Sequence, residues 1–214
     1  MDPLLAKDQE NISGILKHTL SVAEKYFKKN NDIPPGRFIA DIPLGNLPET
    51  GIGAVEALEF FEKEFAHQIA NSAGPHYFGF VTGGSTPASV AGDWLVSTYD
   101  QNACGSNDSI APQIERQTIH YFKQLFGLSA DYFGSFVTGA TMSNFVSLAI
   151  ARQWIGEQQG VDFSNDGLGK VPIKIISATP HSSIIKSLSM LGIGRKAMVK
   201  IDTLPDREAI DLKA

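Results

Sequence analysis

The fold class is decided by the stretch Ser135-Phe136-Val137-Thr138-Gly139-Ala140-Thr141-Met142. It predicts a short strand over 135–138, a tight turn at 139–141 and a helix over 142–154. A second unit follows, with a strand over 173–177, a loop over 178–181, a helix over 182–191 and a strand over 197–201. Because strands that alternate with helices are typical of parallel sheets, we predict an α/β domain.

The chain before this domain has a different sequence pattern, without alternating strands and helices. Asp2 and Pro3 are a helix cap and first helical residue, and apolar residues then recur at helical spacing as far as Lys29. Residues 30–50 are rich in proline and predict an extended connector, and a second amphipathic helix follows. We expect residues 1–75 to form a helical N-terminal arm with its connector, and residues 76–214 to begin the α/β domain.

Composition excludes several classes of protein. The 214 residues are 43% hydrophobic and carry a formal net charge of -5, so no broad basic face is available for nucleic acid. The single cysteine, Cys104, excludes an internal disulfide framework and Cys-rich zinc sites. The sequence starts without a signal-peptide pattern, and its apolar stretches are too short to span a membrane. We therefore expect a cytoplasmic protein with no membrane partner.

Common nucleotide and hydrolase motifs are missing. Gly192-Ile193-Gly194-Arg195-Lys196-Ala197 matches G-x-G-x-x-A, but it follows a predicted helix and precedes a strand, the reverse of a dinucleotide fingerprint. Gly169-Lys170 lacks the earlier glycine of a P-loop, and the sequence contains neither G-x-S-x-G nor H-E-x-x-H.

The turn at Gly139, Ala140 and Thr141 is a candidate anion site, because free amides and a helix dipole meet there. The alternative is simple capping of the helix by Thr141 or Ser143. His181 lies at the corresponding edge of the predicted sheet, where open α/β folds place ligands. An anion site beside a flat imidazole suggests a phosphorylated planar cofactor. The other histidines are not grouped at metal-ligand spacing and predict no metal site; they are His18, His67, His76 and His120.

Several segments together resemble one known family. They are 76–84, 92–95, 101–102, 111–115, 125–128, 134–152 and 181–184, the last with Lys186 and 191–194. From about residue 55 onward, the sequence resembles the group II pyridoxal-phosphate (PLP)-dependent amino-acid decarboxylases, which include glutamate and aromatic-amino-acid decarboxylases. The resemblance implies the large domain of a PLP-dependent transferase-like, fold-type-I enzyme, here incomplete.

The resemblance also implies roles for individual residues. Gly139, Ala140 and Thr141 would hold the phosphate of PLP, and His181 would stack on the pyridine ring and help to protonate the carbanion after carbon dioxide leaves. His76 and Phe80 would face the substrate, Phe80 across the interface of a homodimer.

The resemblance leaves two requirements unmet. In the family, an acidic residue in Asp-x-Ala-x-Gly pairs with the pyridinium nitrogen, and a lysine after a histidine forms the internal Schiff base. The sequence has neither pattern, and Lys170, Lys186 and Lys200 are interpreted as surface charges or, for Lys186, as part of a helix face. We therefore expect the N-terminal half of a cytoplasmic decarboxylase (a carboxy-lyase of amino-acid metabolism), inactive alone and completed by a missing half, as a second chain or a cleaved remainder.

Two other functions remain open on the sequence. One is a non-catalytic, truncated module. The other is a different fold-type-I PLP enzyme, such as an aminotransferase or a carbon-carbon lyase. The amino-acid substrate is not readable: Tyr77 and Phe80 permit an aromatic one, and Arg37 is a possible counter-charge for an acidic one.

Overall fold

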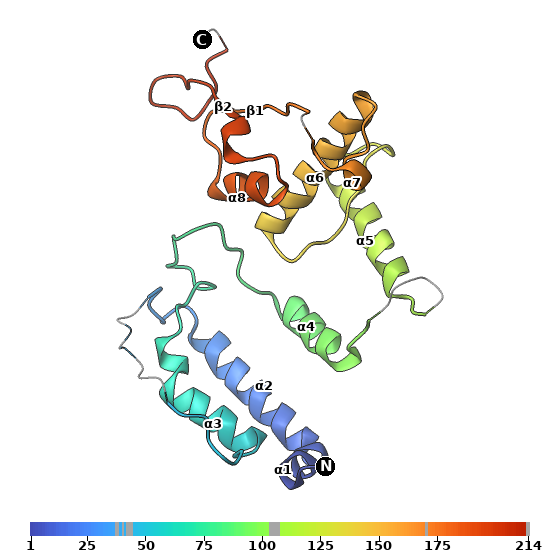
Figure 1. Ribbon diagram of the computed structural model, residues 1–214. Helices are drawn as coiled ribbons and strands as arrows, with labels where there is room; N and C mark the ends of the chain where they lie inside the picture. Colours follow the sequence, from blue (N-terminus) through green and yellow to red (C-terminus); the bar gives the residue numbers. More distant parts are fainter. Residues whose placement is uncertain (37–38, 40, 42–44, 103–107, 170, 213–214) are drawn as a thin grey trace. The chain divides into compact units, whose positions relative to one another are not determined.

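The computed structural model describes residues 1–36, 39, 41, 45–102, 108–169 and 171–212. Arg37, Cys104 and Lys170, which the sequence analysis singled out, lie outside these ranges. The chain forms two compact units, Met1–Gln101 and Asn102–Ala214 (Figure 1). The expected domain boundary at residues 75 and 76 stays a prediction.

The first unit opens with α1 (Pro3–Glu10) and α2 (Ile12–Lys29). The cap predicted at Asp2 is confirmed, since its carboxylate accepts from the backbone N–H groups of Leu4 and Leu5. The expected single helix is interrupted at Asn11, which ends α1 and begins α2 with φ -99° and ψ 21°. Asn, whose side chain competes with helical hydrogen bonds, is a common residue at such a break.

The helix α3 (Ala54–Glu64) lies beside α2, and η1 (Ala66–Gln68) continues it as a single tight turn. Asp8 of α1 caps α3 by accepting from the N–H of Ala54 at 2.9 Å. Buried Asn71 then ties the following segment to the end of α2. Its amide donates to the carbonyls of Asn30 and Ile33 at 2.9 and 3.1 Å.

The last helix of the first unit, α4 (Pro87–Tyr99), carries a proline in its first turn. Thr86 is its cap, and the Thr86 hydroxyl accepts from the N–H of Ser89 at 3.2 Å while the Ser89 hydroxyl accepts from the N–H of Thr86. This reciprocal capping box satisfies amides that the helix itself leaves free.

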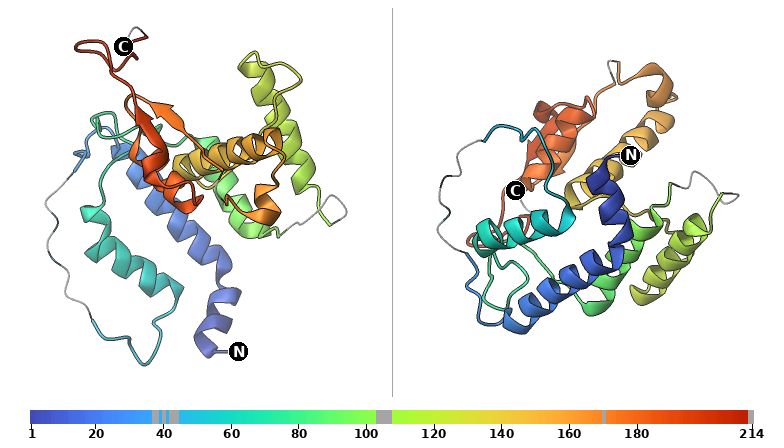
Figure 2. Two further views of the ribbon diagram at one scale, coloured as in Figure 1. Left: turned by 45° about the horizontal axis from the view of Figure 1, so that its top comes forward. Right: turned by 90° about the horizontal axis from the view of Figure 1, so that it is seen from below.

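The second unit contains α5 (Ala111–Leu125), α6 (Ala140–Gln158), α7 (Phe163–Asp166), α8 (Ser182–Met190) and the short turn η2 (Arg195–Ala197). The helices α6 and α8 lie side by side (Figures 1 and 2). Leu188 of α8 is fully buried, and Arg152 of α6 donates to the carbonyl of Leu191, just beyond α8, at 2.9 Å.

The parallel sheet predicted from the sequence is present as two strands, β1 (Ile175–Ser177) and β2 (Met198–Lys200). Ile175 pairs with Met198 and Ser177 with Lys200, and α8 lies between the two strands in the sequence. The prediction of a crossover helix joining parallel strands is therefore confirmed.

The strand predicted over 135–138 is wrong within the described structure. This segment has no regular secondary structure, and no described strand lies beside it to complete a ladder. The N–H of Phe136 donates instead to the Glu115 carboxylate of α5 at 3.3 Å. Strand-forming residues alone do not make a strand, because the backbone groups need a partner segment.

The molecule leaves much of its surface uncovered. Its accessible area is 17125 Å², whereas a folded chain of 23.1 kDa exposes about 9,700 Å² and two folded units of half that mass about 11,600 Å². Only four hydrophobic side chains are buried among the described residues: Phe163, Ala178, Leu188 and Leu191. None of the described helices is long and apolar enough to cross a membrane.

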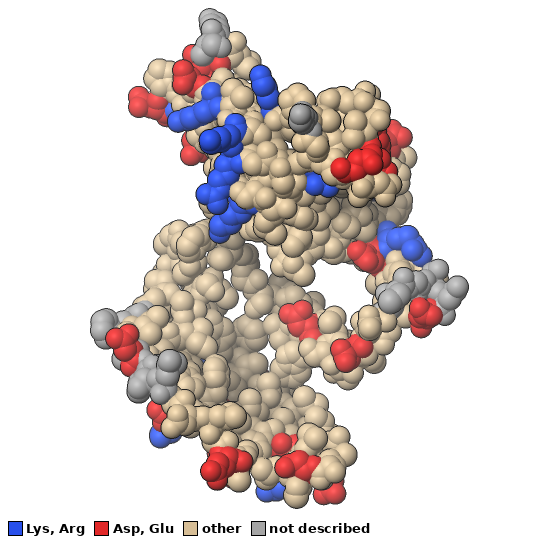
Figure 3. Space-filling model, viewed as in Figure 1, with Lys and Arg blue, Asp and Glu red and all other residues tan. Residues whose placement is uncertain are grey.

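Charges are distributed unevenly in the second unit. Lys and Arg side chains gather over α8 and the strands in the view of Figure 3. Lys186 and Lys200 are exposed, which confirms their interpretation as surface charges.

Candidate functional site

The predicted phosphate turn lies at the start of α6. Gly139 is the residue before the helix, with φ +152° and ψ 172°, and no side chain caps the helix. The first bond of the helix runs from the N–H of Ser143 to the carbonyl of Gly139 at 3.0 Å. The capping role considered for Thr141 and Ser143 is therefore wrong, and the preceding amides of Ala140, Thr141 and Met142 point out of the helix end.

The space in front of this turn is open. A Cβ atom placed on Gly139 would meet no atom within 4 Å, and Gly139, Ala140 and Thr141 are all exposed. Uncapped amides at the positive end of a 19-residue helix attract an anion such as a phosphate group.

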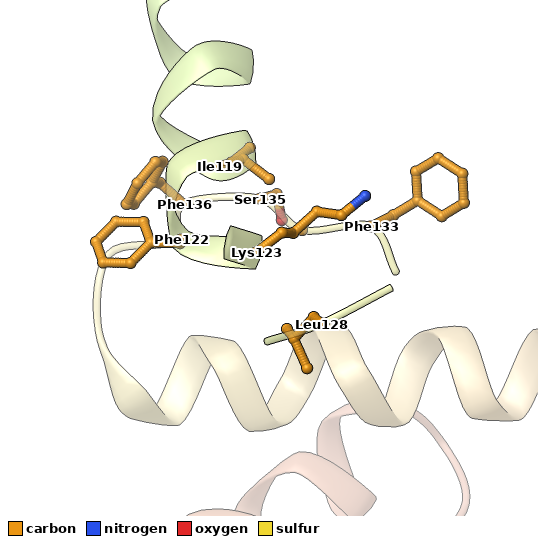
Figure 4. A pocket seen from close by; sticks show the side chains of 8 residues that line it. Ile119, Phe122, Lys123, Leu128, Phe133, Ser135 and Phe136 are labelled. Carbon is orange, nitrogen blue, oxygen red and sulfur yellow. The ribbon is translucent and has the colours of Figure 1, made fainter. Parts of the chain in front are cut away.

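The segment that leads into the turn is anchored on α5. The ring of Phe136 packs edge-on against Phe122, with 6.0 Å between ring centroids. Lys123 donates to the carbonyl of Ala130 at 2.9 Å, and its ammonium lies 6.0 Å from the centroid of the Phe133 ring. These side chains surround a cavity of about 170 Å³ (Figure 4). We interpret this cavity as part of the support of the turn, because the chain that lines it, 133–136, continues directly into Gly139.

His181 begins the neighbouring helix. It is the N-cap of α8, and its Nδ1 accepts from the backbone N–H of Ser183 at 3.2 Å. His181 is exposed, and Nε2 has no hydrogen-bond partner among the described residues. The capping bond therefore occupies one ring nitrogen and leaves the other, with the flat face of the ring, accessible to a ligand.

The two predicted parts of the site are connected through side chains. Asn144, one turn beyond Ala140 on α6, donates from Nδ2 to the hydroxyl of Ser183 at 2.8 Å. The same hydroxyl lies 2.8 Å from Nδ1 of His181. The structure thus brings the phosphate turn and His181 together on adjacent helix N-termini.

Sequence reasoning assigned no role to Asn144 or Ser183. The sequence does not set them apart, because other polar residues, such as Ser147 and Ser187, lie one turn further along the same helices. Ser183 is only 2% exposed, and a polar side chain so well buried requires hydrogen-bond partners.

The predicted substrate residues lie in the first unit. His76 is exposed in the loop before α4, and Phe80 is 94% exposed with a positive φ of 56°. They belong to the unit Met1–Gln101, whereas the turn at Gly139 and His181 belong to the unit Asn102–Ala214.

No group of three or more His, Cys, Asp or Glu side chains in the described part of the chain could hold a metal ion. The geometry of the site suits PLP better than a metal ion, in two respects. Uncapped amides with open space before them fit its phosphate, and the accessible imidazole face fits its planar ring.

Comparison with known proteins identifies the same fold. No family model matches the chain. The aromatic-L-amino-acid decarboxylase of Bacillus atrophaeus is 28% identical over 159 residues, covering 74% of this chain and 31% of that protein. The L-2,4-diaminobutyrate decarboxylase of Acinetobacter baumannii is 24% identical over 163 residues, covering 71% of this chain and 32% of that protein. This chain therefore spans about a third of the length of the curated relatives that it matches.

Solved structures match over almost the whole chain. Oryza sativa TDC with PLP superimposes with a TM-score of 0.77 at 18% identity, covering 95% of this chain and 45% of that one. The glutamate decarboxylase domain of a Vibrio parahaemolyticus diaminobutyrate-pyruvate transaminase and L-2,4-diaminobutyrate decarboxylase gives 0.77 at 20% identity, covering 94% and 46%. Mouse CSAD in apo form gives 0.77 at 19% identity, covering 95% and 44%. The chain thus resembles the group II PLP-dependent amino-acid decarboxylases and has the fold of part of such a fold-type-I enzyme.

Proposed function

We propose that this chain is the phosphate-binding and ring-binding part of a PLP-dependent amino-acid decarboxylase, a carboxy-lyase of amino-acid metabolism. The observation that carries the proposal is the pairing of an uncapped N-terminus on α6 with an accessible histidine on α8, joined through Asn144 and Ser183. The two curated relatives described above are decarboxylases, which favours this reaction over amino transfer or carbon-carbon cleavage.

In this proposal, each residue has a physical task. The amides of Ala140 and Thr141, next to Gly139, bind the cofactor phosphate, and the dipole of α6 adds to the attraction. The ring of His181 lies against the pyridine ring and keeps that face free of water. The accessible Nε2 of His181 is the atom from which a proton would reach the substrate carbon. When bound, PLP supplies the electron sink for the pair left behind as carbon dioxide departs.

The substrate is proposed to be a small amino acid bound partly by His76 and Phe80. Both side chains are exposed, and a phenyl ring that is 94% exposed suits a surface that another molecule covers. A homodimer in which Phe80 of one subunit faces the partner's cofactor would provide that cover.

The lysine and the acidic partner of the cofactor are proposed to come from chain beyond these residues or from a second polypeptide. The sheet supports this view, because parallel sheets are normally covered on both faces and flanked by further strands. Here Ile176 of β1 is 66% exposed and Val199 of β2 is 44% exposed, so one face of the sheet is open.

The first unit also has apolar surface for a partner. A cavity of about 820 Å³ lies between α2 and α4, lined by apolar side chains that include Leu16, Trp94 and Leu95. We propose that this surface is covered in a cytoplasmic homodimer. The single cysteine of the sequence suits a reducing compartment.

A cofactor analogue tests the site directly. Pyridoxine 5'-phosphate carries the ring and phosphate but no aldehyde, so it cannot react with surface lysines. We expect it to shift the backbone amide NMR signals of Ala140, Thr141 and Met142, whereas pyridoxine without phosphate at the same concentration leaves them unchanged. His181→Ala should weaken binding by up to about tenfold, the value of one ring-stacking contact. His120→Ala, which removes an imidazole from exposed α5, is the matched control.

Unshifted α6 amides at saturating analogue would refute the phosphate assignment. The reaction is tested separately by supplying the chain with a polypeptide that carries the lysine and measuring carbon dioxide released from amino acids. We expect release only from the complemented protein, and transfer of the amino group to a keto acid instead would favour an aminotransferase.

A further inference from the structure

The hydrogen bonds around Ser183 have a definite direction. The Asn144 Nδ2 amide group can donate hydrogen bonds but cannot accept them. The Ser183 hydroxyl therefore accepts from it at 2.8 Å. A hydroxyl has a single hydrogen to donate, and the remaining neighbour of this one is Nδ1 of His181, also at 2.8 Å. The bonds therefore run from Asn144 to Ser183 to His181.

This direction determines which ring nitrogen of His181 is protonated. Nδ1 accepts from two donors, the hydroxyl and the backbone N–H of Ser183. A nitrogen that accepts carries no hydrogen, so the neutral ring holds its hydrogen on Nε2, the accessible atom.

We infer that Asn144 and Ser183 are positioning residues for His181: they fix its tautomer and ring orientation from the helix that carries the phosphate turn. The importance of His181 to a reaction rests on the proposed function, but the tautomer does not. Helix capping alone does not require this arrangement, because Ser, Asp or Asn cap helices well without a ring. Here the capping residue is a histidine whose ring is bonded to buried Ser183, and Ser183 is bonded to Asn144 of α6. This arrangement caps the helix and also presents the Nε2–H of His181 as an oriented donor.

The inference is tested by the nitrogen chemical shifts of histidine rings in the full chain, without cofactor. These shifts distinguish protonated from unprotonated Nδ1, and loss of one signal set in His181→Gln assigns the residue. We expect His181 to be in the Nε2–H form, with shifts distinct from those of His120, whose Nε2 lies 3.2 Å from the Gln124 side-chain amide nitrogen and accepts from it.

Three variants examine the chain of bonds. Asn144→Asp places an acceptor opposite the Ser183 hydroxyl and draws its hydrogen away from His181, so we expect a population with protonated Nδ1 to appear. Ser183→Ala removes the hydroxyl and should increase tautomer averaging, whereas Ser183→Thr keeps the hydroxyl and should restore the original shifts. The amide spectrum of α6 and α8 verifies folding, and the Ala and Thr pair decides the result if Asn144→Asp does not fold.

Two results would overturn the inference. One is an Nδ1–H or fully averaged His181 in the unaltered chain, and the other is an unchanged His181 signal in both Asn144→Asp and Ser183→Ala. The measurement needs no ligand, so a chain that shows the expected tautomer but fails to bind pyridoxine 5'-phosphate would refute the proposed function and leave this inference standing.

Discussion

Asp162 illustrates how a single exposed carboxylate organises the chain between α6 and α7. Its Oδ1 accepts from the Gln153 amide at 3.0 Å and from the N–H of Ser164 at 2.9 Å, while Oδ2 accepts from the Asn165 amide at 2.8 Å. The hydrogen bond from Gln153, followed by the backbone bond from Ser164, lowers the pKa of Asp162 below its ordinary value.

The lowered pKa predicts a pH-dependent contribution to stability. The folded chain binds a proton at Asp162 more weakly than the unfolded chain, so the carboxylate stabilises the fold above the ordinary Asp pKa. That contribution is lost as the pH falls through the ordinary range toward the lowered pKa. We expect Asp162→Asn to lower the urea midpoint near neutral pH and to lower it by less at about pH 3, below the ordinary Asp pKa. Exposed Asp202→Asn serves as the control, and an equal effect of Asp162→Asn at both pH values would contradict the assignment.

At the scale of elements, α6 depends on a glycine near its end. Gly156 is buried, and a Cβ atom placed there would lie 2.7 Å from the carbonyl oxygen of Val161 and 2.8 Å from the ring of Phe163. The N–H of Val161 donates back to the carbonyl of Gly156 at 2.9 Å. The absence of a side chain therefore lets the chain fold back and bury Phe163 of α7, which is 2% exposed.

Two glycine substitutions should have opposite effects. Gly156→Ala forces a contact with rigid backbone, and we expect it to reduce the free energy of unfolding by about 1–3 kcal/mol. Gly92→Ala, within α4 and with no atom within 4 Å of the added Cβ, should increase it by about 0.5–1 kcal/mol because alanine favours helix. Urea unfolding of both variants checks the pair. Stabilisation by both would show that α6 has room at Gly156.

At the scale of the whole molecule, the accessible surface area exceeds what a folded monomer of this mass normally shows. It includes large side chains from both units, such as Phe80 at 94% and Phe133 at 95% exposure. Hydrophobic surface of this extent promotes association with whatever can cover it.

We expect the chain alone to bind a hydrophobic dye strongly and to associate as its concentration rises, as measured by dye fluorescence and light scattering. A polypeptide that completes the sheet should reduce both signals, while an unrelated protein of similar size should not. A monomeric chain that binds no dye would contradict the proposal of a missing partner or remainder.

Local interactions account for what the sequence determined by itself. Caps at Asp2 and Thr86, the strands around Ile175 and Val199 and the turn at Gly139 follow from residue preferences that act within a few positions. The α/β class and the resemblance to decarboxylases follow from the order of these local units.

Tertiary structure decided the features that depend on contacts distant in sequence. The segment 135–138 is strand-like in composition but lacks a described partner, so its pairing could not be read from its own residues. The same holds for the site: Asn144 and Ser183 are 39 positions apart, and only the packing of α6 on α8 brings them into the hydrogen bond that orients His181. A hydrogen bond needs both partners within about 3 Å, and at this separation in sequence only the fold determines whether they meet.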